Sequence, residues 1–362
     1  MNNPLRIGIV GWATRTGLGS MNADMFDLGF ADSWLAVQHP KLGVEECVLS
    51  RPQAVSVVGT RAGKALGKFL DDLQIVVFAE RPVLDDIDLV AECRRRGILT
   101  CCIPMLEWLP MPDQRAWVQQ TDVMWATSQW CGRILAALAA KYRRRRYVCH
   151  WEHAIIGQRW GVNLARFPFK PRTRCERFLF ANGFGGAHQR RGASVVQQIA
   201  QLLPQARFVV LSQRDNLPEM PANCEVLTEN FETAARIYKD GDIFLAPSRW
   251  EGLGLTLYEA QACGLPLATT DGSPMDEARP LIKLPCTTSQ VTMRFDVITS
   301  HEVVPARAAQ ILSEWVGADI SAASQHARQQ IVKDYSLQTT LENVRAELTK
   351  RYRLREPYRT RR

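Results

Sequence analysis

Residues 242–272 read DIFLAPSRWEGLGLTLYEAQACGLPLATTDG, and this stretch carries the strongest indication of the fold. Its apolar run at 243–246 predicts a buried strand. After a glycine-containing turn, residues 255–263 follow a helical pattern that a Gly-Leu-Pro sequence ends, and 267–269 predict the next strand. The stretch therefore predicts a strand–loop–helix–strand unit. The N–H groups at the start of such a helix carry partial positive charge and can bind a phosphate.

Two glutamates in this stretch, Glu251 and Glu259, are a sharper signal. They are eight positions apart, and at about 3.6 residues per turn eight helical steps return nearly to the same face. We therefore expect both carboxylates to point the same way. Carboxylates accept hydrogen bonds from paired hydroxyls, which sugars and riboses both offer. An isolated pair with this spacing is more typical of a solvated helix start, so the residues around it decide its interpretation.

Those surrounding residues, PSRWEGLGLTLYEAQACGLPLATTD at 247–271, closely resemble the donor-site signature of the retaining GT-B glycosyltransferases, the group 1 glycosyl transferases with an E-x7-E donor site. The resemblance implies the GT-B architecture, with two Rossmann-like, doubly wound α/β domains facing across a cleft. It also implies transfer of a hexose from a nucleotide sugar, UDP- or GDP-hexose, with retention at the anomeric carbon. No bound cofactor and no metal site are expected.

The resemblance also assigns roles to the two glutamates. It implies that Glu251 binds hydroxyls of the donor sugar and that Glu259 binds the ribose diol. Catalysis would be mostly electrostatic, because the family does not rely on a dedicated protein nucleophile. The further donor-binding residues of this stretch are Gly252, Leu253, Gly254 and Leu255.

Two adjacent arginines, Arg190 and Arg191, follow a predicted strand at 178–181. Relatives in the family carry an arginine and a lysine in this loop, the lysine directly before a glycine, and these clamp the donor pyrophosphate. Arg191 precedes Gly192 and matches the lysine position with an arginine. Arg190 is the candidate for the second charge, since the usual upstream arginine is missing. A guanidinium can still bind phosphate through two parallel hydrogen bonds.

Short apolar runs alternate with helical stretches in the first part of the chain, which predicts a parallel sheet with helices on both faces. The runs lie at 7–10, 54–58, 75–79, 99–103 and 122–127. The loop after the first run contains Gly17, Leu18 and Gly19, which match a glycine pair that faces the cleft in the family. Glu107 follows the run at 99–103, at the carboxyl edge where open α/β sheets bind ligands. It is a candidate catalytic residue that holds the acceptor, with a structural or capping role as the alternative.

At 362 residues the chain is long enough for two domains of ordinary size. We expect an acceptor domain at 1–168, a donor domain at 169–335, and at 336–362 a helix that crosses back to the first domain plus a basic tail. The sequence lacks a signal-peptide pattern and an apolar run near the ~20 residues that span a bilayer. Its ten cysteines lack C-x-x-C spacing. These features favour a cytoplasmic protein (the host cytoplasm, if viral), with a peripheral membrane location as the alternative.

A net charge of +8 favours an anionic partner without identifying it. Besides the tail, cations gather at the end of a helix that is predicted to begin near Gly132. This cluster consists of Arg143, Arg144, Arg145 and Arg146. A solvated basic face is one interpretation, and a surface for DNA or an anionic membrane is the other. Because the helix is rich in alanine and poor in large apolar residues, the sequence narrowly favours a hydroxymethylated DNA base as acceptor over a lipid-linked or envelope glycan.

A catalytically silent nucleotide-sugar or DNA-binding module on the same fold would have a similar pattern of strands and helices. The presence of both glutamates and of the arginine pair argues against that alternative. Hydrolysis of the donor, which needs no acceptor, would separate the two.

Overall fold

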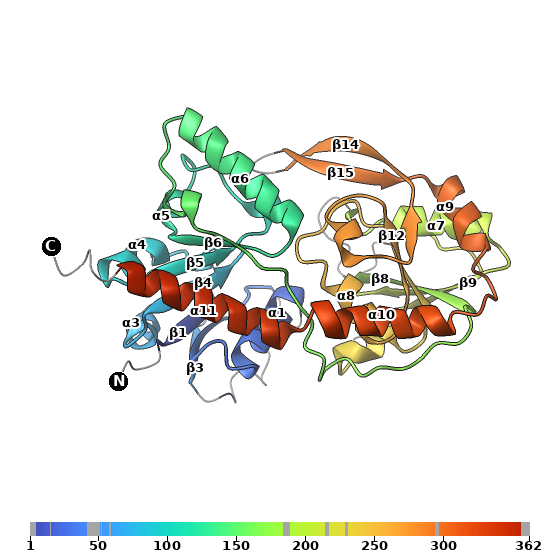
Figure 1. The fold of residues 1–362 in the computed structure, drawn as a ribbon, viewed down its shortest axis with the longest axis horizontal. Helices are drawn as coiled ribbons and strands as arrows, with labels where there is room; N and C mark the ends of the chain where they lie inside the picture. Colours follow the sequence, from blue (N-terminus) through green and yellow to red (C-terminus); the bar gives the residue numbers. More distant parts are fainter. Residues whose placement is uncertain are drawn as a thin grey trace. The chain divides into compact units, whose positions relative to one another are not determined.

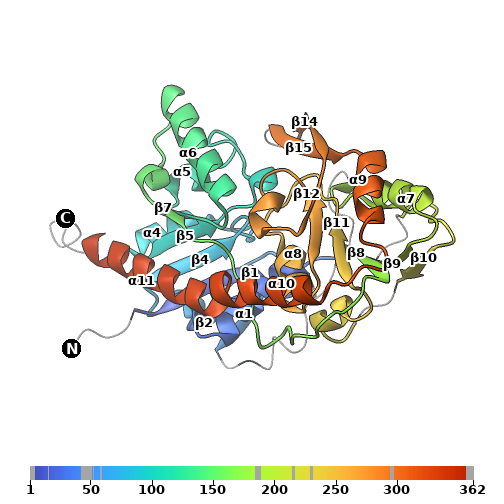
Figure 2. The same ribbon diagram turned by 45° about the vertical axis from the view of Figure 1, so that its right-hand side comes forward.

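The chain folds into two compact units, each described here by itself. The first is mainly Met1–Arg159 and Gln338–Arg362, and the second is mainly Trp160–Thr292 and Val297–Leu337. Figures 1 and 2 show the fold as a ribbon from two directions. The computed structural model describes residues 5–14, 16–41, 51, 53–57, 59–183, 189–213, 217–228, 231–293 and 297–355.

The first unit is built on a parallel sheet of seven strands in the order β3-β2-β1-β4-β5-β6-β7. Chain order reverses between β1 and β4, which lie side by side. The residues of β1, β2, β4, β5 and β6 are buried throughout, as expected for a sheet covered on both faces. The strands are β1 (Ile7–Trp12), β2 (Ser33–Val37), β3 (Ala54–Val57), β4 (Ile75–Ala79), β5 (Leu99–Ile103), β6 (Val123–Ala126) and β7 (Ile155–Gly157).

Helices connect these strands, and several begin at a side-chain cap. Thr16, Asp88 and Ser128 each accept a hydrogen bond from the third residue after them, which satisfies one of the N–H groups left open at a helix start. The helices are α1 (Gly17–Asp27), α3 (Ala65–Leu70), α4 (Leu89–Arg95), α5 (Trp117–Gln120) and α6 (Gln129–Arg144), with short 3-10 turns η1 (Leu106–Trp108) and η2 (His150–His153).

The second unit is built on a parallel sheet of six strands in the order β10-β9-β8-β11-β12-β13. Chain order reverses here between β8 and β11. One apolar core contains Phe178 and Phe208, and another contains Tyr238 and Phe244. The strands are β8 (Arg177–Gly183), β9 (Arg207–Ser212), β10 (Cys224–Leu227), β11 (Ile243–Ala246), β12 (Leu267–Thr270) and β13 (Ile282–Leu284).

The helices of the second unit alternate with its strands. In the described residues they are α7 (Ala193–Leu202), α8 (Leu255–Ala262), α9 (Pro305–Ser313) and α10 (Ser321–Asp334), with 3-10 turns η4 (Ala234–Tyr238) and η5 (Met275–Ala278). A separate antiparallel hairpin of β14 (Cys286–Thr292) and β15 (Val297–Val303), orange in Figure 1, follows β13.

The long helix α11 (Leu337–Arg355) passes the amino ends of strands in the first unit (Figures 1 and 2). Arg345 donates to the carbonyl oxygens of Leu5 and Phe30 and pairs with Asp32 at 3.2 Å. Nearer the end of α11, Arg355 pairs with Asp122 at 3.1 Å. These contacts attach the helix to the segments that precede β1, β2 and β6.

The predicted alternation of strands and helices is confirmed, and both sheets are doubly wound as expected. Several local predictions were wrong. Helix α1 begins at Gly17, so the glycines that were expected in the loop after the first strand form the first turn of this helix. Helix α6 begins at Gln129 and not near residue 132.

The segment 160–168, which the sequence assigned to the end of the first domain, belongs to the second unit. Val162 pairs with Ser336, and its N–H donates to the carbonyl of Tyr335 at 2.8 Å. Phe167 lies in the core of the second unit.

Candidate active site

The carboxyl edge of the second sheet brings together three of the charged residues that the sequence singled out. The segment after β8 carries Arg190 and Arg191, and the segment after β11 carries Glu251. Because β8 and β11 are neighbours and chain order reverses between them, these segments flank the switch point of the sheet. Open α/β sheets bind their ligands in the crevice at such a switch point.

Glu251 lies at the centre of this group, with only 3% of its surface exposed. One carboxylate oxygen accepts from Arg191 at 2.6 Å and from the Ser248 hydroxyl at 2.8 Å. The other accepts from Arg190 at 3.3 Å. A buried carboxylate requires such partners, because an isolated charge at this depth would be strongly unfavourable. We call Arg190, Arg191, Ser248 and Glu251 the arginine–glutamate cluster.

Arg191 is exposed to about the same extent as Arg190, with 19% and 20% of their side-chain surfaces accessible. Burial lowers the pKa of the Arg191 guanidinium, and the negative charge of Glu251 acts in the opposite direction. Glu259 and Tyr238 also raise this pKa, so both glutamates of the predicted pair act on the same cation. Arg191 donates to the Thr256 hydroxyl at 3.2 Å as well.

Backbone geometry fixes the position of the arginine pair. Gly192, the N-cap of α7, has φ of 81°, a left-handed conformation that favours glycine. A Cβ atom there would lie 2.4 Å from the carbonyl oxygen of Pro247, so the segment after β8 packs directly against the segment after β11. The N–H of Arg249 donates to the carbonyl of Arg190 at 2.8 Å and joins the same two segments.

Two helices begin beside the cluster. Gly192 is the N-cap of α7 and Gly254 is the N-cap of α8. Among the described residues, no side chain caps either helix start. Their first N–H groups therefore add partial positive charge at this edge of the sheet, which favours an anion.

The second glutamate, Glu259, lies on α8 and accepts a hydrogen bond from the Tyr238 hydroxyl at 2.6 Å. Tyr238 is only 1% exposed, and burial together with the charge of Glu259 raises its pKa well above the ordinary value. Glu251 precedes α8, which begins at Leu255, so the eight steps between the glutamates do not run through one continuous helix as the spacing argument assumed. Both carboxylates nevertheless act on Arg191, since the turn before α8 brings Glu251 back to it.

The loop between the two glutamates contains the other predicted donor-binding residues. Gly252, Leu253 and Gly254 lead directly into α8, and Leu255 is its first residue.

The remaining predicted site residues belong to the first unit. Gly17, Leu18 and Gly19 form the first turn of α1, directly after β1. A Cβ atom on Gly19 would lie 1.9 Å from the carbonyl oxygen of Thr14, so a larger residue would not fit there. Glu107 is buried in η1, 7% exposed, after β5.

The basic cluster lies where α6 ends. Arg143 pairs with Glu152 at 3.1 Å, and this carboxylate partly compensates the positive charge of Arg143. All four arginines, Arg143, Arg144, Arg145 and Arg146, are exposed. The predicted basic tail lies outside the described residues from 356 onward.

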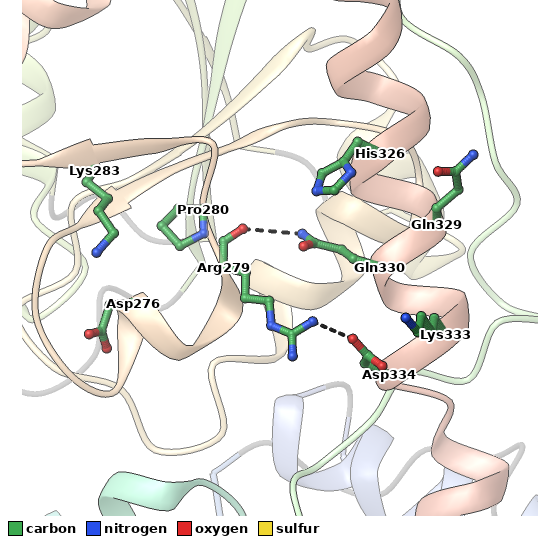
Figure 3. Close-up of a pocket in the computed structure, with 9 residues that line it drawn as sticks. All are labelled: Asp276, Arg279, Pro280, Lys283, His326, Gln329, Gln330, Lys333 and Asp334. Carbon is green, nitrogen blue, oxygen red and sulfur yellow. Dashed lines mark hydrogen bonds and ion pairs between the residues drawn. The ribbon is translucent and has the colours of Figure 1, made fainter.

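A pocket of about 650 Å³ lies elsewhere in the second unit, between the segment from η5 to β13 and helix α10 (Figure 3). Arg279 pairs with Asp334 across it, and Gln330 donates to the Arg279 carbonyl at 3.3 Å. Lys283, on the opposite side of the view, pairs with Asp271 at 2.9 Å. None of the predicted site residues lines this pocket, so we place the candidate site at the arginine–glutamate cluster.

Three polar residues in or beside the cluster were not among the predicted site residues. Ser248 is part of the quoted signature, so its position beside Glu251 carried a usable signal. Thr256 also belongs to that signature, but its contact with Arg191 depends on the turn before α8. The contact of Tyr238 with Glu259 depends on η4, and no sequence pattern indicated it. In the part of the chain that the structure describes, no three His, Cys, Asp or Glu side chains are grouped to hold a metal ion. No described helix is long and apolar enough to cross a membrane.

Comparisons with known proteins agree with this geometry. The family model described as glycosyl transferases group 1 matches residues 178–280, which include the whole arginine–glutamate cluster. A glycosyltransferase structure from Rickettsia africae has a TM-score of 0.68 and 13% identity, and the match covers 97% of this chain and 99% of that chain. The lipopolysaccharide outer core galactosyltransferase WaaB has a TM-score of 0.57 and 12% identity over 96% of this chain and 100% of that chain.

One curated relative shares a short and much more similar segment. The lipopolysaccharide core biosynthesis mannosyltransferase LpsB of Rhizobium meliloti is 56% identical over 34 residues, which cover 9% of this chain and 10% of that protein. The chain thus matches only about a tenth of the length of this relative. The chain has the GT-B fold, and its residues 178–280 match the group 1 glycosyl transferases.

The Tyr238–Glu259 contact leads to a first testable expectation. Tyr238→Phe removes the hydrogen bond that orients Glu259 but keeps its carboxylate, so nucleotide affinity should fall by roughly 3- to 10-fold, less than the roughly 10- to 100-fold of a lost hydrogen bond to a charged group. Glu259→Ala should weaken binding further, because it removes the acceptor itself. Calorimetric titration with UDP and GDP measures both effects. Equal affinity in both variants and the wild type would exclude Glu259 from the nucleotide site.

Proposed function

We propose that this protein transfers a hexose from a nucleotide sugar to an acceptor hydroxyl, with retention at the anomeric carbon. The observation that carries the proposal is the arginine–glutamate cluster at the switch point of the second sheet. In this proposal the second unit binds the donor and the first unit binds the acceptor.

The donor pyrophosphate would bind between Arg190, Arg191 and the starts of α7 and α8. Guanidinium groups and helix N-termini are the two protein features best suited to phosphate. During transfer, negative charge grows on the leaving phosphate as its bond to the anomeric carbon breaks. Cations fixed in place beforehand stabilise that charge in the transition state more than in the ground state, and this difference lowers the barrier.

Glu251 would exchange partners when the donor binds. Without a donor, its carboxylate pairs with both arginines, and one of their two positive charges remains uncompensated by it. A pyrophosphate offers these arginines a stronger and doubly charged partner, which releases Glu251 to accept hydroxyls of the hexose. Glu259, farther along α8, would hold the ribose diol. The Gly17–Leu18–Gly19 turn and Glu107 are the candidates for contacts to the donor and the acceptor in the first unit.

The direct test is hydrolysis of nucleotide sugars without any acceptor. We expect release of nucleoside diphosphate from one UDP- or GDP-hexose in a panel, with the freed sugar first appearing as the donor's own anomer. Tight donor binding without turnover, with or without an acceptor, would instead support a silent nucleotide-sugar-binding module. Release of the opposite anomer would contradict retention.

We further propose that the acceptor is an envelope glycan. A glycan acceptor is supported by two similar proteins. One is named as a lipopolysaccharide core mannosyltransferase and the other as a lipopolysaccharide outer core galactosyltransferase. A hydroxymethylated DNA base is the second candidate, and the exposed arginines at the end of α6 are the observation that favours it.

Binding measured over a range of salt concentrations separates these acceptors. If DNA is the partner, log affinity should fall linearly with log salt, with a slope of about −0.9 per phosphate contact. Changing Arg143, Arg144, Arg145 and Arg146 to serine should then flatten that slope. We expect instead that the wild type binds vesicles containing anionic lipid through these arginines and has no measurable affinity for duplex DNA at ~50 mM salt. Tight, salt-dependent DNA binding would overturn the glycan assignment.

A further inference from the structure

The β14–β15 hairpin contacts the candidate active site from outside the part of the chain that matches the family. The match ends at residue 280, and the hairpin begins at Cys286. Its strands pair from Cys286 opposite Val303 to Thr292 opposite Val297, and the N–H of Val304 donates to Pro285 at 2.9 Å. The base of the hairpin is therefore closed by regular pairing.

His301, in β15, joins this base to two segments at the carboxyl edge of the sheet. Its backbone N–H donates to the carbonyl of Arg249 at 2.9 Å. Its ring nitrogen Nε2 lies 3.1 Å from the carbonyl oxygen of Ser273. The ring also packs against Gly272, where an added Cβ atom would lie only 2.5 Å from Nδ1. Both the segment after β11 and the segment after β12 are thus held by one residue of the hairpin.

Glu302, the next residue of β15, holds the Arg249 side chain. Its Oε1 accepts from Arg249 Nε at 2.6 Å and from the hydroxyl of Ser300 at 2.7 Å. Ser300 is fully buried, so the carboxylate is anchored on the hairpin side. The Arg249 guanidinium also lies over the ring of buried Trp250, 5.4 Å from its centroid. An arginine held both by a carboxylate and by an aromatic face has little freedom to move.

Arg249 also connects directly to the arginine–glutamate cluster, so its position affects the position of the cluster. Its N–H donates to the carbonyl of Arg190 at 2.8 Å, and Glu251 follows two residues later in the chain. The contacts therefore run without a gap from Glu302 through Arg249 to the backbone of Arg190. A displacement of Arg249 would move a cation and the carboxylate of the cluster together.

We propose that the hairpin base positions the phosphate-binding arginines, and that Glu302 is a positioning residue that acts through Arg249. This inference rests on the proposed function of the cluster. Charge stabilisation of a leaving phosphate depends on geometry, and a displacement of about 1 Å can lower a rate by up to about 10²-fold. Glu302 itself would touch neither the donor nor the acceptor.

The test compares Glu302→Gln with Asp334→Asn. Asp334 also pairs with an arginine in the second unit, Arg279, but it has no contact to the cluster among those described. We expect Glu302→Gln to lower kcat of donor hydrolysis about 10-fold, with KM changed less than about 2-fold, because the lost contact matters mainly in the transition state. Asp334→Asn should leave both constants unchanged, and the melting temperatures of the two variants should be similar.

A second pair of variants tests whether Glu302 acts through Arg249. If it does, Arg249→Ala and Arg249→Ala/Glu302→Gln should have the same kcat. Additive losses, or a Glu302→Gln variant that behaves like Asp334→Asn, would overturn the positioning role. Arg190→Ala/Arg191→Ala is measured in parallel. If that variant keeps full activity, the proposed function of the cluster fails and this inference fails with it; if it is inactive, a negative result at Glu302 contradicts this inference alone.

Discussion

Replacing Arg190 and Arg191 together by alanine is expected to lower turnover by at least about 10²-fold, the scale on which the loss of oriented charge stabilisation acts. The two guanidinium groups converge on Glu251 at 2.6 and 3.3 Å, so they are already held at one point of the sheet edge. Among the described residues, the starts of α7 and α8 are then the features left that we assign to the leaving phosphate. The measurement is the rate of nucleoside diphosphate release at saturating donor.

Two controls make this result interpretable. Arg207→Ala removes an exposed arginine at the start of β9, on the opposite edge of the same sheet, and should leave turnover unchanged. Arg191→Lys keeps a cation where relatives carry lysine, so it should retain much more activity than the alanine variants. Full activity in the double alanine variant would contradict the assignment of the phosphate clamp.

A loss of stability could also lower the turnover of the double alanine variant, and a further substitution tests this explanation separately. The double alanine variant leaves the buried Glu251 carboxylate without its arginine partners. An uncompensated buried charge typically lowers the free energy of unfolding by about 3–5 kcal/mol. Adding Glu251→Gln to the double variant removes that charge and should recover most of the lost unfolding free energy. The triple variant should remain inactive. Recovery of activity together with stability would show that the arginines act only in folding.

Glu251→Gln alone should lower turnover by roughly 10- to 100-fold, because hydrogen bonds to a charged acceptor contribute about 1.5–3 kcal/mol. The same substitution should not lower the affinity for the free nucleotide. In the proposed function Glu251 competes with phosphate for both arginines, so its replacement by a neutral residue should leave the affinity for UDP or GDP unchanged or raise it. The preference for the nucleotide sugar over the free nucleotide should fall.

Paired measurements of turnover and of nucleoside diphosphate affinity test this expectation. Glu225→Gln, an exposed glutamate on β10 of the same sheet, is the matched control and should change neither quantity. A Glu251→Gln variant with wild-type turnover would exclude contacts between this carboxylate and the hexose. Weaker nucleotide binding would contradict the exchange of partners.

The sequence predicted those parts of the fold in which local pattern and final structure agree. The apolar runs at β4, β5 and β11 fall where they were expected, because strands buried on both faces read as continuous apolar segments. The hairpin was missed for the opposite reason. Strand β14, CTTSQVT, is largely exposed and polar and has no apolar run or alternation to reveal it.

The candidate site was predicted in its residues but not in its contacts. Arg190, Arg191 and Glu251 came from adjacent charges and from a signature, and neither pattern states that they pair. Their pairing depends on the neighbouring positions of β8 and β11, which are far apart in sequence. Tyr238 and Glu302 reach the site from η4 and β15, so only the tertiary structure could reveal them.

The central claim is that the arginine–glutamate cluster binds the diphosphate of the donor, and calorimetric titration of UDP and GDP tests it most directly. The wild type should bind one of the two nucleotides. The triple variant Arg190→Ala/Arg191→Ala/Glu251→Gln leaves no unpaired carboxylate at position 251. It should bind the same nucleotide at least about 10-fold more weakly, as expected for the loss of charge-assisted hydrogen bonds to phosphate. Arg207→Ala should bind like the wild type. Equal affinity in the wild type and the triple variant would show that the nucleotide binds elsewhere and would contradict the account.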